Sequence, residues 1–190
     1  MIEIIVGTNR RGSLSGVLAN WLLKKYQQMS VDAQVMRLLD LPPETYSPDA
    51  YKQKPQQVIE FTQRILNAKG LVVISPEYNG SMAGALKLFI DLLPFPESFE
   101  NRAVCYIGLA AGQFGALRPV EHLMQVFGYR NAYNYPKRVF LPFAHKILDP
   151  EAGITDEEVS NRLIDQAKGC LLYTSPSPRD QRGSRMPSSA

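Results

Sequence analysis

The sequence is poor in the residues that build disulfide frameworks and metal centres. Its 190 residues include two cysteines and two histidines. Cys105 and Cys170 are far apart and predict neither a disulfide framework nor a metal-ligand pair, and Cys105, inside an apolar run, is expected to be a small core residue. His122 and His145 stand in no Ser–His–Asp or Glu–His order, so both are expected to be structural or exposed. We therefore predict no metal site and no acid–base catalytic residue.

The sequence also lacks a long apolar run and a strong charge of either sign. No apolar stretch reaches membrane-spanning length, and the start, MIEIIVGTNRR, lacks the basic-then-apolar order of a signal peptide. The formal net charge of +3 is too small to favour nucleic acid or an acidic membrane as a partner. We therefore expect a cytoplasmic protein that binds neither nucleic acid nor membrane.

The last 20 residues, LLYTSPSPRDQRGSRMPSSA, differ in composition from the rest, with five serines, three prolines and no apolar periodicity. Such a segment cannot bury enough apolar surface to offset the entropy of ordering it. Its letters also resemble translated cloning or sequencing-adapter read-through, and a native disordered extension is the alternative. We therefore predict one domain over residues 1–170 and a disordered, non-native tail over residues 171–190.

Apolar periodicity predicts alternating strands and helices. Apolar and β-branched runs predict strands at residues 2–6, 33–38, 71–75, 103–110 and 139–141. Spacings of three and four predict helices at residues 13–26, 56–67, 82–93, 117–127 and 155–168. Thr155 and Glu158 form a capping box for the last helix, and four prolines predict a long loop over residues 39–55. This order predicts an α/β fold, a flavodoxin-like three-layer sandwich around a five-stranded parallel sheet of order 2-1-3-4-5.

The three most unusual loops follow the first, third and fourth predicted strands. They cover residues 7–15, 76–81 and 111–116. In a sheet of this order, ligands bind beyond the carboxyl ends of those three strands. The coincidence predicts a ligand site that all three loops share.

The first loop, within VGTNRRGSLS (residues 6–15), offers donors for a phosphate. Ser13 is placed to cap a helix whose N-terminus presents unpaired N–H groups and a partial positive charge, and Arg10 adds a forked guanidinium. Gly7 and Gly12 would let the backbone approach the ligand closely. The hydroxyl groups are those of Thr8, Ser13 and Ser15. An ordinary capped loop with solvated arginines is the alternative.

Other phosphate-binding motifs fit the amino-acid sequence less well. The Gly-Lys-Ser/Thr ending of nucleoside-triphosphate loops is absent, and so is GxGxxG, although Asp40 could mimic the ribose-binding acid of a dinucleotide fold. A phospho-receiver domain would need acids where this chain has arginines and Glu77. The first loop therefore suits a single terminal phosphomonoester best.

The second loop lies in SPEYNGS (residues 75–81) and contains an Asn79-Gly80 turn. The exposed backbone amides of such a turn could bond the polar edge of a flat heteroaromatic ring, and Tyr78 could lie along that ring. Glu77 could pair with a partner chain or anchor the turn; a plain β–α turn is the alternative. In the third loop, within AAGQFGALRP (residues 110–119), the glycines that would let a planar ligand approach the backbone are Gly112 and Gly115.

The predicted helix over residues 82–93 is apolar almost all round, with only Lys87 and Asp91 breaking its apolar lines. One face of this helix covers the sheet, so the other needs cover as well. This pattern predicts self-association, as a homodimer or a homotetramer.

GTNRRGSLSGVLA, SPEYNGSMAGALKLFIDLL and AAGQFGALRP resemble the signature segments of the NADPH-dependent FMN reductase family, over about residues 2–168. The resemblance implies that the first loop binds the FMN phosphate, the second lies against the isoalloxazine and the third contacts the ring from the other side. The residues implied are Thr8, Arg10, Ser13, Leu14 and Ser15 for the first loop, Pro76, Glu77, Tyr78, Asn79, Gly80 and Ser81 for the second, and Gly112 to Gly115 for the third. The chain departs from the family at Thr8, where serine is common, and at Ala116, where a further glycine is expected.

The resemblance also implies an activity. NADPH (or NADH) would pass a hydride to bound FMN, and the reduced protein would then pass it to a small acceptor such as a quinone, free flavin, azo compound or metal oxyanion. A flavodoxin-type electron carrier without NAD(P)H oxidation is the alternative, and a flavin-free interaction domain is a third reading. Arg11 and Arg118 are the candidates for contact with the 2′-phosphate of NADPH.

Overall fold

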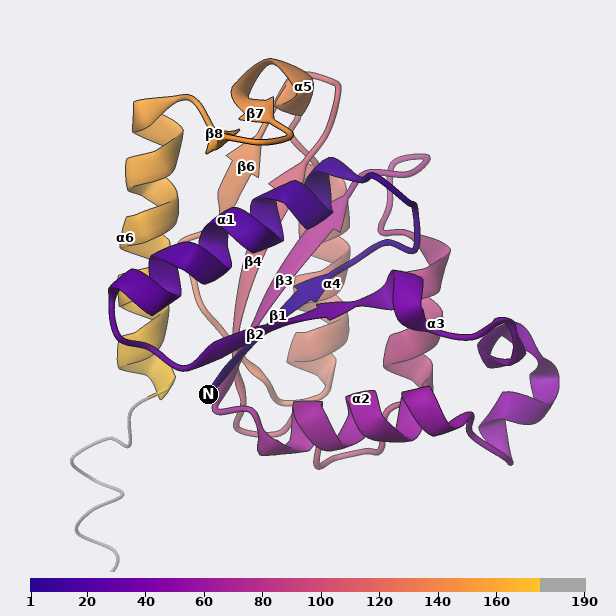
Figure 1. The fold of residues 1–190 in the computed structure, drawn as a ribbon. Helices are drawn as coiled ribbons and strands as arrows, with labels where there is room; N and C mark the ends of the chain where they lie inside the picture. The colour runs from indigo at the N-terminus through magenta and orange to yellow at the C-terminus, as the bar shows by residue number, and fades with distance from the viewer. Residues whose placement is uncertain (175–190) are drawn as a thin grey trace, which may run out of the picture.

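A computed structural model describes residues 1–174 of the chain as a twisted parallel sheet between two layers of helices (Figure 1). The sheet order is β2-β1-β3-β4-β5, with β6 also paired to β4, and every pair is parallel. The strands are β1 (Ile2–Val6), β2 (Ala33–Arg37), β3 (Gly70–Pro76), β4 (Ala103–Leu109), β5 (Tyr133–Asn134) and β6 (Val139–Leu141). The predicted fold class and strand order are confirmed.

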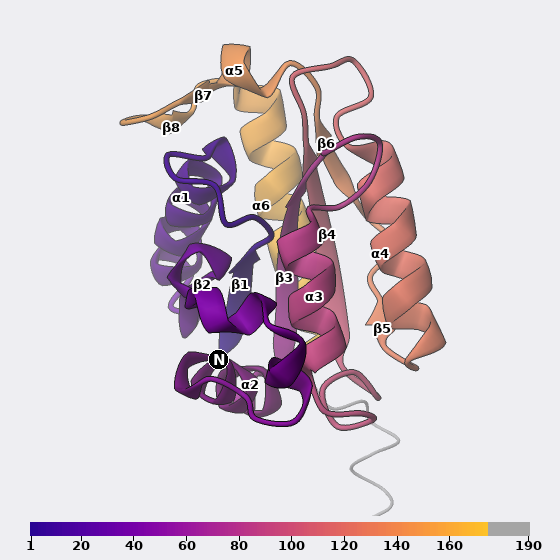
Figure 2. The same cartoon turned by 90° about the vertical axis from the view of Figure 1, so that its right-hand side faces the viewer.

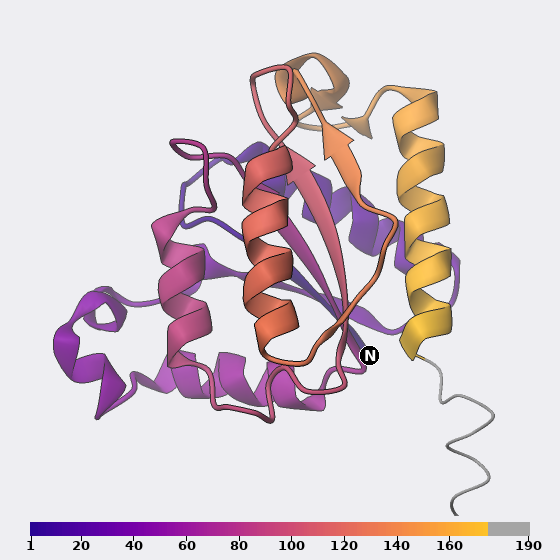
Figure 3. The same ribbon diagram turned by 180° about the vertical axis from the view of Figure 1, so that it is seen from behind.

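Two short strands share the fifth position of the sheet. β5 pairs with the start of β4 and β6 with its end, and Pro136 lies between the two short strands. Proline cannot donate a ladder hydrogen bond, so an edge strand is interrupted there. In Figure 3 the arrows of β4 and β6 point to the end of the molecule where α5 (Ala144–Ile147) lies.

The helices cover the two faces of the sheet, and each face has its own core. Figure 2 shows α1 on one side of the sheet and α3 and α4 on the other. α1 (Leu14–Gln28) and α6 (Glu157–Thr174) pack on one face, against side chains such as Ile4 and Ile74. α2 (Gln56–Asn67), α3 (Gly84–Leu92) and α4 (Leu117–Tyr129) pack on the other, against Ile5 and Val73. Neighbouring strand residues point to opposite faces, which is why these strands are apolar throughout.

Several short elements differ from the sequence prediction. Within the predicted loop over residues 39–55, two 3₁₀ turns begin with proline, which is favoured at a first helical position. The 3₁₀ turns are η1 (Leu38–Asp40), η2 (Pro43–Tyr46) and η3 (Pro48–Tyr51). A hairpin of β7 (Leu148–Asp149) and β8 (Gly153–Ile154) was not expected either, and it packs on α1.

The predicted capping box of the last helix is wrong. The carboxylate of Asp156, rather than the hydroxyl of Thr155, accepts a hydrogen bond from the backbone N–H of Val159 at 2.9 Å. The Thr155 hydroxyl instead donates to the carbonyl oxygen of Ile147 at 3.2 Å. The Thr155 side chain is therefore bonded to the preceding segment at Ile147, and Asp156 is the residue that caps α6.

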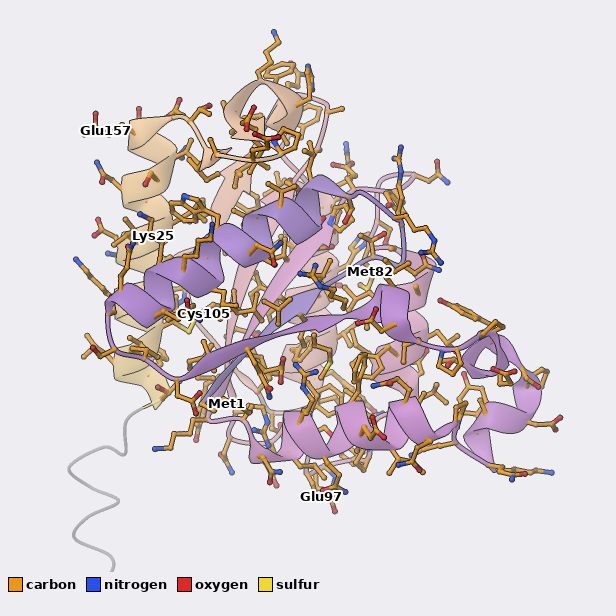
Figure 4. All side chains as sticks on the ribbon, viewed as in Figure 1. Met1, Lys25, Met82, Glu97, Cys105 and Glu157 are labelled. Atoms are coloured by element: carbon orange, nitrogen blue, oxygen red, sulfur yellow. A yellow bond between two sulfur atoms is a disulfide. The ribbon has the colours of Figure 1, made fainter. Side chains whose placement is uncertain are left out.

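Cys105 in β4 and Cys170 in α6 form a disulfide, so the expectation of no disulfide is wrong. Both residues are 1% exposed, as predicted for Cys105, and the sulfur atoms lie near the Cys105 label in Figure 4. The two cysteines meet because α6 packs across β4, although 65 positions separate them in the chain. α6 also continues four residues past the predicted domain boundary at 170, and Tyr173 packs against Tyr135. The rest of the predicted tail, residues 175–190, lies outside the described residues.

Candidate functional site

The three predicted loops meet at the carboxyl ends of β1, β3 and β4, around an open cleft of about 300 Å³ that we call the main cleft. Among residues 1–174 it is lined by Arg10, Gly12, Ser13, Leu14, Ser15, Pro76, Glu77, Tyr78, Leu109, Ala110, Ala111, Ala144 and His145. The lining thus includes seven of the predicted site residues: Arg10, Ser13, Leu14, Ser15, Pro76, Glu77 and Tyr78. The prediction that the three loops share one site agrees with this geometry.

The backbone of the first loop is shaped by its two glycines. A Cβ atom on Gly7 would lie 2.6 Å from the carbonyl oxygen of Ile74, so only glycine lets β1 leave the sheet this close to β3. Gly12 has a φ of +63°, in the left-handed region that favours glycine. The loop then enters α1 through Ser13, whose hydroxyl oxygen accepts a hydrogen bond from the N–H of Gly16 at 3.3 Å. The predicted N-cap is therefore confirmed.

The wall of the main cleft at the start of α1 is suited to a dianion. Ser15 is 1% exposed, and its hydroxyl has no hydrogen-bond partner among the described residues. Arg10 is exposed and forms no ion pair with any described residue, and the first turn of α1 holds no acidic side chain. A helix N-terminus, a serine hydroxyl that bonds no described residue and a free guanidinium together fit a phosphate group.

Thr8, predicted to bind the phosphate, has other partners. Its side chain is 1% exposed, and its hydroxyl lies 2.8 Å from the hydroxyl of Tyr78. The N–H of Arg10 also donates to the Thr8 hydroxyl oxygen at 3.2 Å. Thr8 is not part of the lining of the main cleft. Its contact with Tyr78 instead connects the first loop to the second.

The second loop contains the predicted tight turn. Asn79 and Gly80 have φ values of +51° and +74°, and Tyr78 and Ser81 exchange two backbone hydrogen bonds of 2.9 and 3.1 Å. Two positive φ values in succession define a type I′ turn, for which Asn-Gly is the preferred pair. The turn projects beyond the lining of the main cleft, so Asn79, Gly80 and Ser81 do not contribute to it.

Two side chains of α4 hold the second loop. The imidazole Nδ1 of His122 lies 2.9 Å from the hydroxyl of Ser81, and Arg118 lies 3.8 Å from the carboxylate of Glu77. From the sequence, Glu77 could anchor the turn or pair with a partner chain. In the structure its carboxylate faces Arg118 of the same chain, which connects the second loop to α4. These contacts also engage Ser81, one of the predicted flavin contacts.

The two glycines of the third loop have different surroundings. A Cβ on Gly115 would lie 2.9 Å from the backbone nitrogen of Pro142, so packing within the protein by itself requires glycine there. Gly112 has open space around it but lies outside the lining of the main cleft. Ala110 and Ala111 line the cleft instead. Ala116 has a φ of +68°, a conformation that glycine adopts more readily, which explains why glycine is expected there.

The segment around α5 supplies a wall that sequence reasoning missed. The N–H of Ala144 donates to the carbonyl oxygen of Ala110 at 2.9 Å, which brings α5 onto the third loop. His145 follows and lines the main cleft while remaining exposed, as predicted. A helix of four residues carries no readable periodicity, so no sequence signal could have found it. No group of three or more histidine, cysteine or acidic side chains suited to a metal ion occurs within residues 1–174.

These features define a class of protein. The sheet has the order β2-β1-β3-β4-β5, so the chain reverses direction across the sheet at β1, and the main cleft lies at this point. Together with a loop after β1 that is suited to phosphate, this arrangement is characteristic of flavodoxin-like flavoproteins. Over residues 1–146 the chain matches the family described as NADPH-dependent FMN reductase. The chain belongs to this family.

Individual relatives agree with the family. An NAD(P)H-dependent FMN reductase from Pseudomonas aeruginosa is 30% identical over 132 residues, 67% of this chain and 71% of the relative. A quinone reductase from Escherichia coli K12 is 28% identical over 176 residues, 90% of each chain. The structure of FerB, a flavoenzyme NAD(P)H:(acceptor) oxidoreductase from Paracoccus denitrificans, shares the fold with a TM-score of 0.77, at 22% identity and over 91% of this chain and 96% of FerB. The protein is an oxidoreductase that uses FMN and NAD(P)H.

Proposed function

We propose that this oxidoreductase binds FMN in the main cleft, oxidises NADPH or NADH there, and reduces a small acceptor such as a quinone, free flavin, azo compound or metal oxyanion. The observation that carries the proposal is the lining of the main cleft at the N-terminus of α1, where the hydroxyl of Ser15 bonds no described residue and the guanidinium of Arg10 forms no ion pair with one. When bound, FMN supplies the redox chemistry, taking a hydride from the nicotinamide and giving it to the acceptor.

The protein's own part is to hold and orient the cofactor. Ser15, Arg10 and the amides at the start of α1 would bind the phosphate, since they converge on one wall of the main cleft. The chain from Pro76 to Tyr78 would border the ring on one side, and Ala110 and Ala111 on the other. These last side chains are short and leave the ring open to a second molecule. Hydride transfer between nucleotide and flavin is direct, so we propose no indispensable acid–base side chain.

We also propose a cytoplasmic homodimer or homotetramer, but the supporting surface differs from the one predicted. The apolar residues of α3 are mostly buried within the protein, and its exposed side carries the Lys87–Asp91 ion pair. Exposed aromatic side chains lie beside it instead. Phe95 is 54% exposed and Tyr129 is 79% exposed, and the guanidinium of Arg130 lies over both rings. Exposed aromatic side chains that lie together favour association, and light scattering of the purified protein measures the assembly.

The visible spectrum of the purified full chain tests the proposed activity, followed by addition of NADPH without air. Flavin bands that bleach within the mixing time are the expected result. Bands that persist with NADPH and NADH but bleach with dithionite would identify an electron carrier that needs a partner protein. A colourless protein that takes up no added FMN would overturn the proposal.

A further inference from the structure

A second cleft of about 300 Å³ lies beside the first loop, next to the main cleft. It is lined by Val6, Thr8, Arg10, Gly12, Ser13, Leu14, Gly16, Val17, Asn20, Arg37, Leu39 and Pro150. Arg10, Gly12, Ser13 and Leu14 line both clefts, so the two are neighbours across one stretch of chain. The second cleft does not include the second or third loop, which border the main cleft alone.

The second cleft carries positive charge that no described side chain neutralises. Among residues 1–174, its lining contains two guanidinium groups, of Arg10 and Arg37, and no carboxylate. Nη2 of Arg37 donates to the side-chain oxygen of Asn20 at 2.6 Å. Nη1 of the same residue lies 3.3 Å from the place where a Cβ of Gly16 would be, beside the first turn of α1. A cation at a helix N-terminus is electrostatically unfavourable unless an anion lies between them.

The acidic side chains nearest along the chain leave this charge unpaired. Asp40 follows the cleft residue Leu39 but forms no ion pair among the described residues. Asp149 precedes Pro150, and its carboxylate accepts the backbone N–H groups of Ala152 and Glu151, which hold its pKa below the usual range. Glu151 is exposed and does not line the cleft. One phosphate in the main cleft would face Arg10, so Arg37 is left for a second anion.

We propose that the second cleft binds the 2′-phosphate of NADPH, with Arg37 as the residue that selects NADPH over NADH. The proposal rests on the proposed function, because it requires the dinucleotide to lie along the first loop with its nicotinamide over the main cleft. A phosphate monoester fits the fork of a guanidinium. Val17, Leu39 and Pro150 provide apolar surface in the same cleft against which an adenosine can lie. Sequence reasoning named Arg11 and Arg118 for this role, and neither lines the second cleft.

Arg37→Gln in the FMN-loaded enzyme tests the assignment kinetically. We expect the KM for NADPH to rise about tenfold or more and the KM for NADH to change less than about twofold, with the flavin spectrum unchanged. Arg162→Gln is the matched control, because Arg162 is an exposed residue of α6 whose carboxylate neighbour Glu158 is 3.9 Å away. The control should leave both KM values unaltered. Equal rises for the two nucleotides, or none, would overturn the assignment.

A binding measurement tests the same assignment without turnover. Calorimetry should show that adenosine 2′,5′-bisphosphate binds the FMN-loaded wild type more tightly than adenosine 5′-monophosphate. Arg37→Gln should remove that difference, and Arg37→Lys should keep part of it. If the wild type bound the two adenosine phosphates equally well, no 2′-phosphate would bind at Arg37. If Arg37→Gln lost FMN, Arg37 would contact the FMN phosphate instead. Either result would overturn the assignment. Failure of the proposed function is distinguishable, because it would appear in the wild type as missing flavin or as no bleaching by either nucleotide.

Discussion

At the scale of single residues, the first loop separates two arginines that are adjacent in sequence. Arg10 lines both clefts, whereas Arg11 is exposed and lines neither. Arg10→Ala should weaken FMN binding by roughly 1.5–3 kcal/mol, the range for a lost hydrogen bond to a charged group. Arg11→Ala should leave the affinity unchanged, because it removes the same charge from a place that faces no cleft.

Fluorescence titration of FMN with the two variants measures this difference. Both variants lose one positive charge from the same loop. The ratio of their FMN affinities therefore reports the position of the lost guanidinium rather than the change in net charge. If both variants bound FMN equally well, the phosphate contact assigned to Arg10 would be wrong.

A buried carboxylate defines the second prediction at this scale. The side chain of Glu3 is fully buried in β1, and its Oε1 atom lies 2.6 Å from Nη2 of Arg64. Burial raises the pKa of Glu3, and the hydrogen bond and charge of Arg64 act against that shift. Arg64→Ala should cost about 3 kcal/mol of unfolding free energy at pH 7, because it leaves a buried charge unpaired. Lys87→Ala, which breaks the exposed pair with Asp91, should cost less than about 1 kcal/mol.

The pH dependence of this loss has a definite sign. A pKa raised in the folded state means that the folded protein holds the Glu3 proton more tightly than the unfolded chain does. Folding then gains from protonation, so the loss caused by Arg64→Ala should shrink as the pH falls from 7 toward 4.5, the ordinary value for glutamate. Urea unfolding of the wild type and both variants at several pH values measures it. A loss that grew on acidification would contradict this account.

At the scale of elements, the exit of β1 from the sheet depends on close backbone approach. A Cβ at Gly7 would meet the Ile74 carbonyl oxygen at 2.6 Å and Cδ2 of Leu86 at 2.9 Å. Gly7→Ala should therefore force β1 and β3 apart and cost about 1–3 kcal/mol. Gly84→Ala is the matched control, because Gly84 begins α3 and, among the described residues outside its own stretch of chain, no atom lies within 4 Å of the new methyl group. It should be neutral or slightly stabilising, since alanine favours a helix.

Thermal unfolding followed by circular dichroism compares the two alanine variants. The expected order of melting temperature places Gly7→Ala well below the wild type and Gly84→Ala at or above it. Equal melting temperatures for the two variants would mean that the chain around Gly7 moves aside for the added methyl group, and would contradict a requirement for glycine at this position.

The elements that sequence reasoning missed are all short. α5, the β7–β8 hairpin and the 3₁₀ turns span two to four residues each, too few to show a period. Their stability comes from contacts with distant chain, such as the hydrogen bond from Ala144 to Ala110. The longer strands and helices lie within two residues of the predicted bounds, because each repeats an apolar pattern over several turns or pleats. The exception is the end of α6, which lies at Thr174, six residues past the predicted end at 168.

At the scale of the whole molecule, the sheet order gathers the loops and places the two clefts side by side. No helix within residues 1–174 is long and apolar enough to cross a membrane. The crossover at the centre of the sheet separates the loop after β1 from its neighbours, and the space opened there becomes the main cleft. α1 begins at this crossover, so the same helix start borders both clefts.

The sequence by itself determined the class of fold, the loops that form the site, the cap at Ser13 and the turn at Asn79-Gly80. These features follow from local backbone preferences and from apolar periodicity, which any stretch of chain carries within itself. Only the tertiary structure decided which side chains face a cleft. Thr8 contacts Tyr78, Ser81 contacts His122, Gly115 packs against the chain at Pro142, and Arg37 comes to lie beside Gly16. Each of these pairings joins residues that are distant in the sequence, and such partners are set by the packing of helices on the sheet rather than by neighbouring letters.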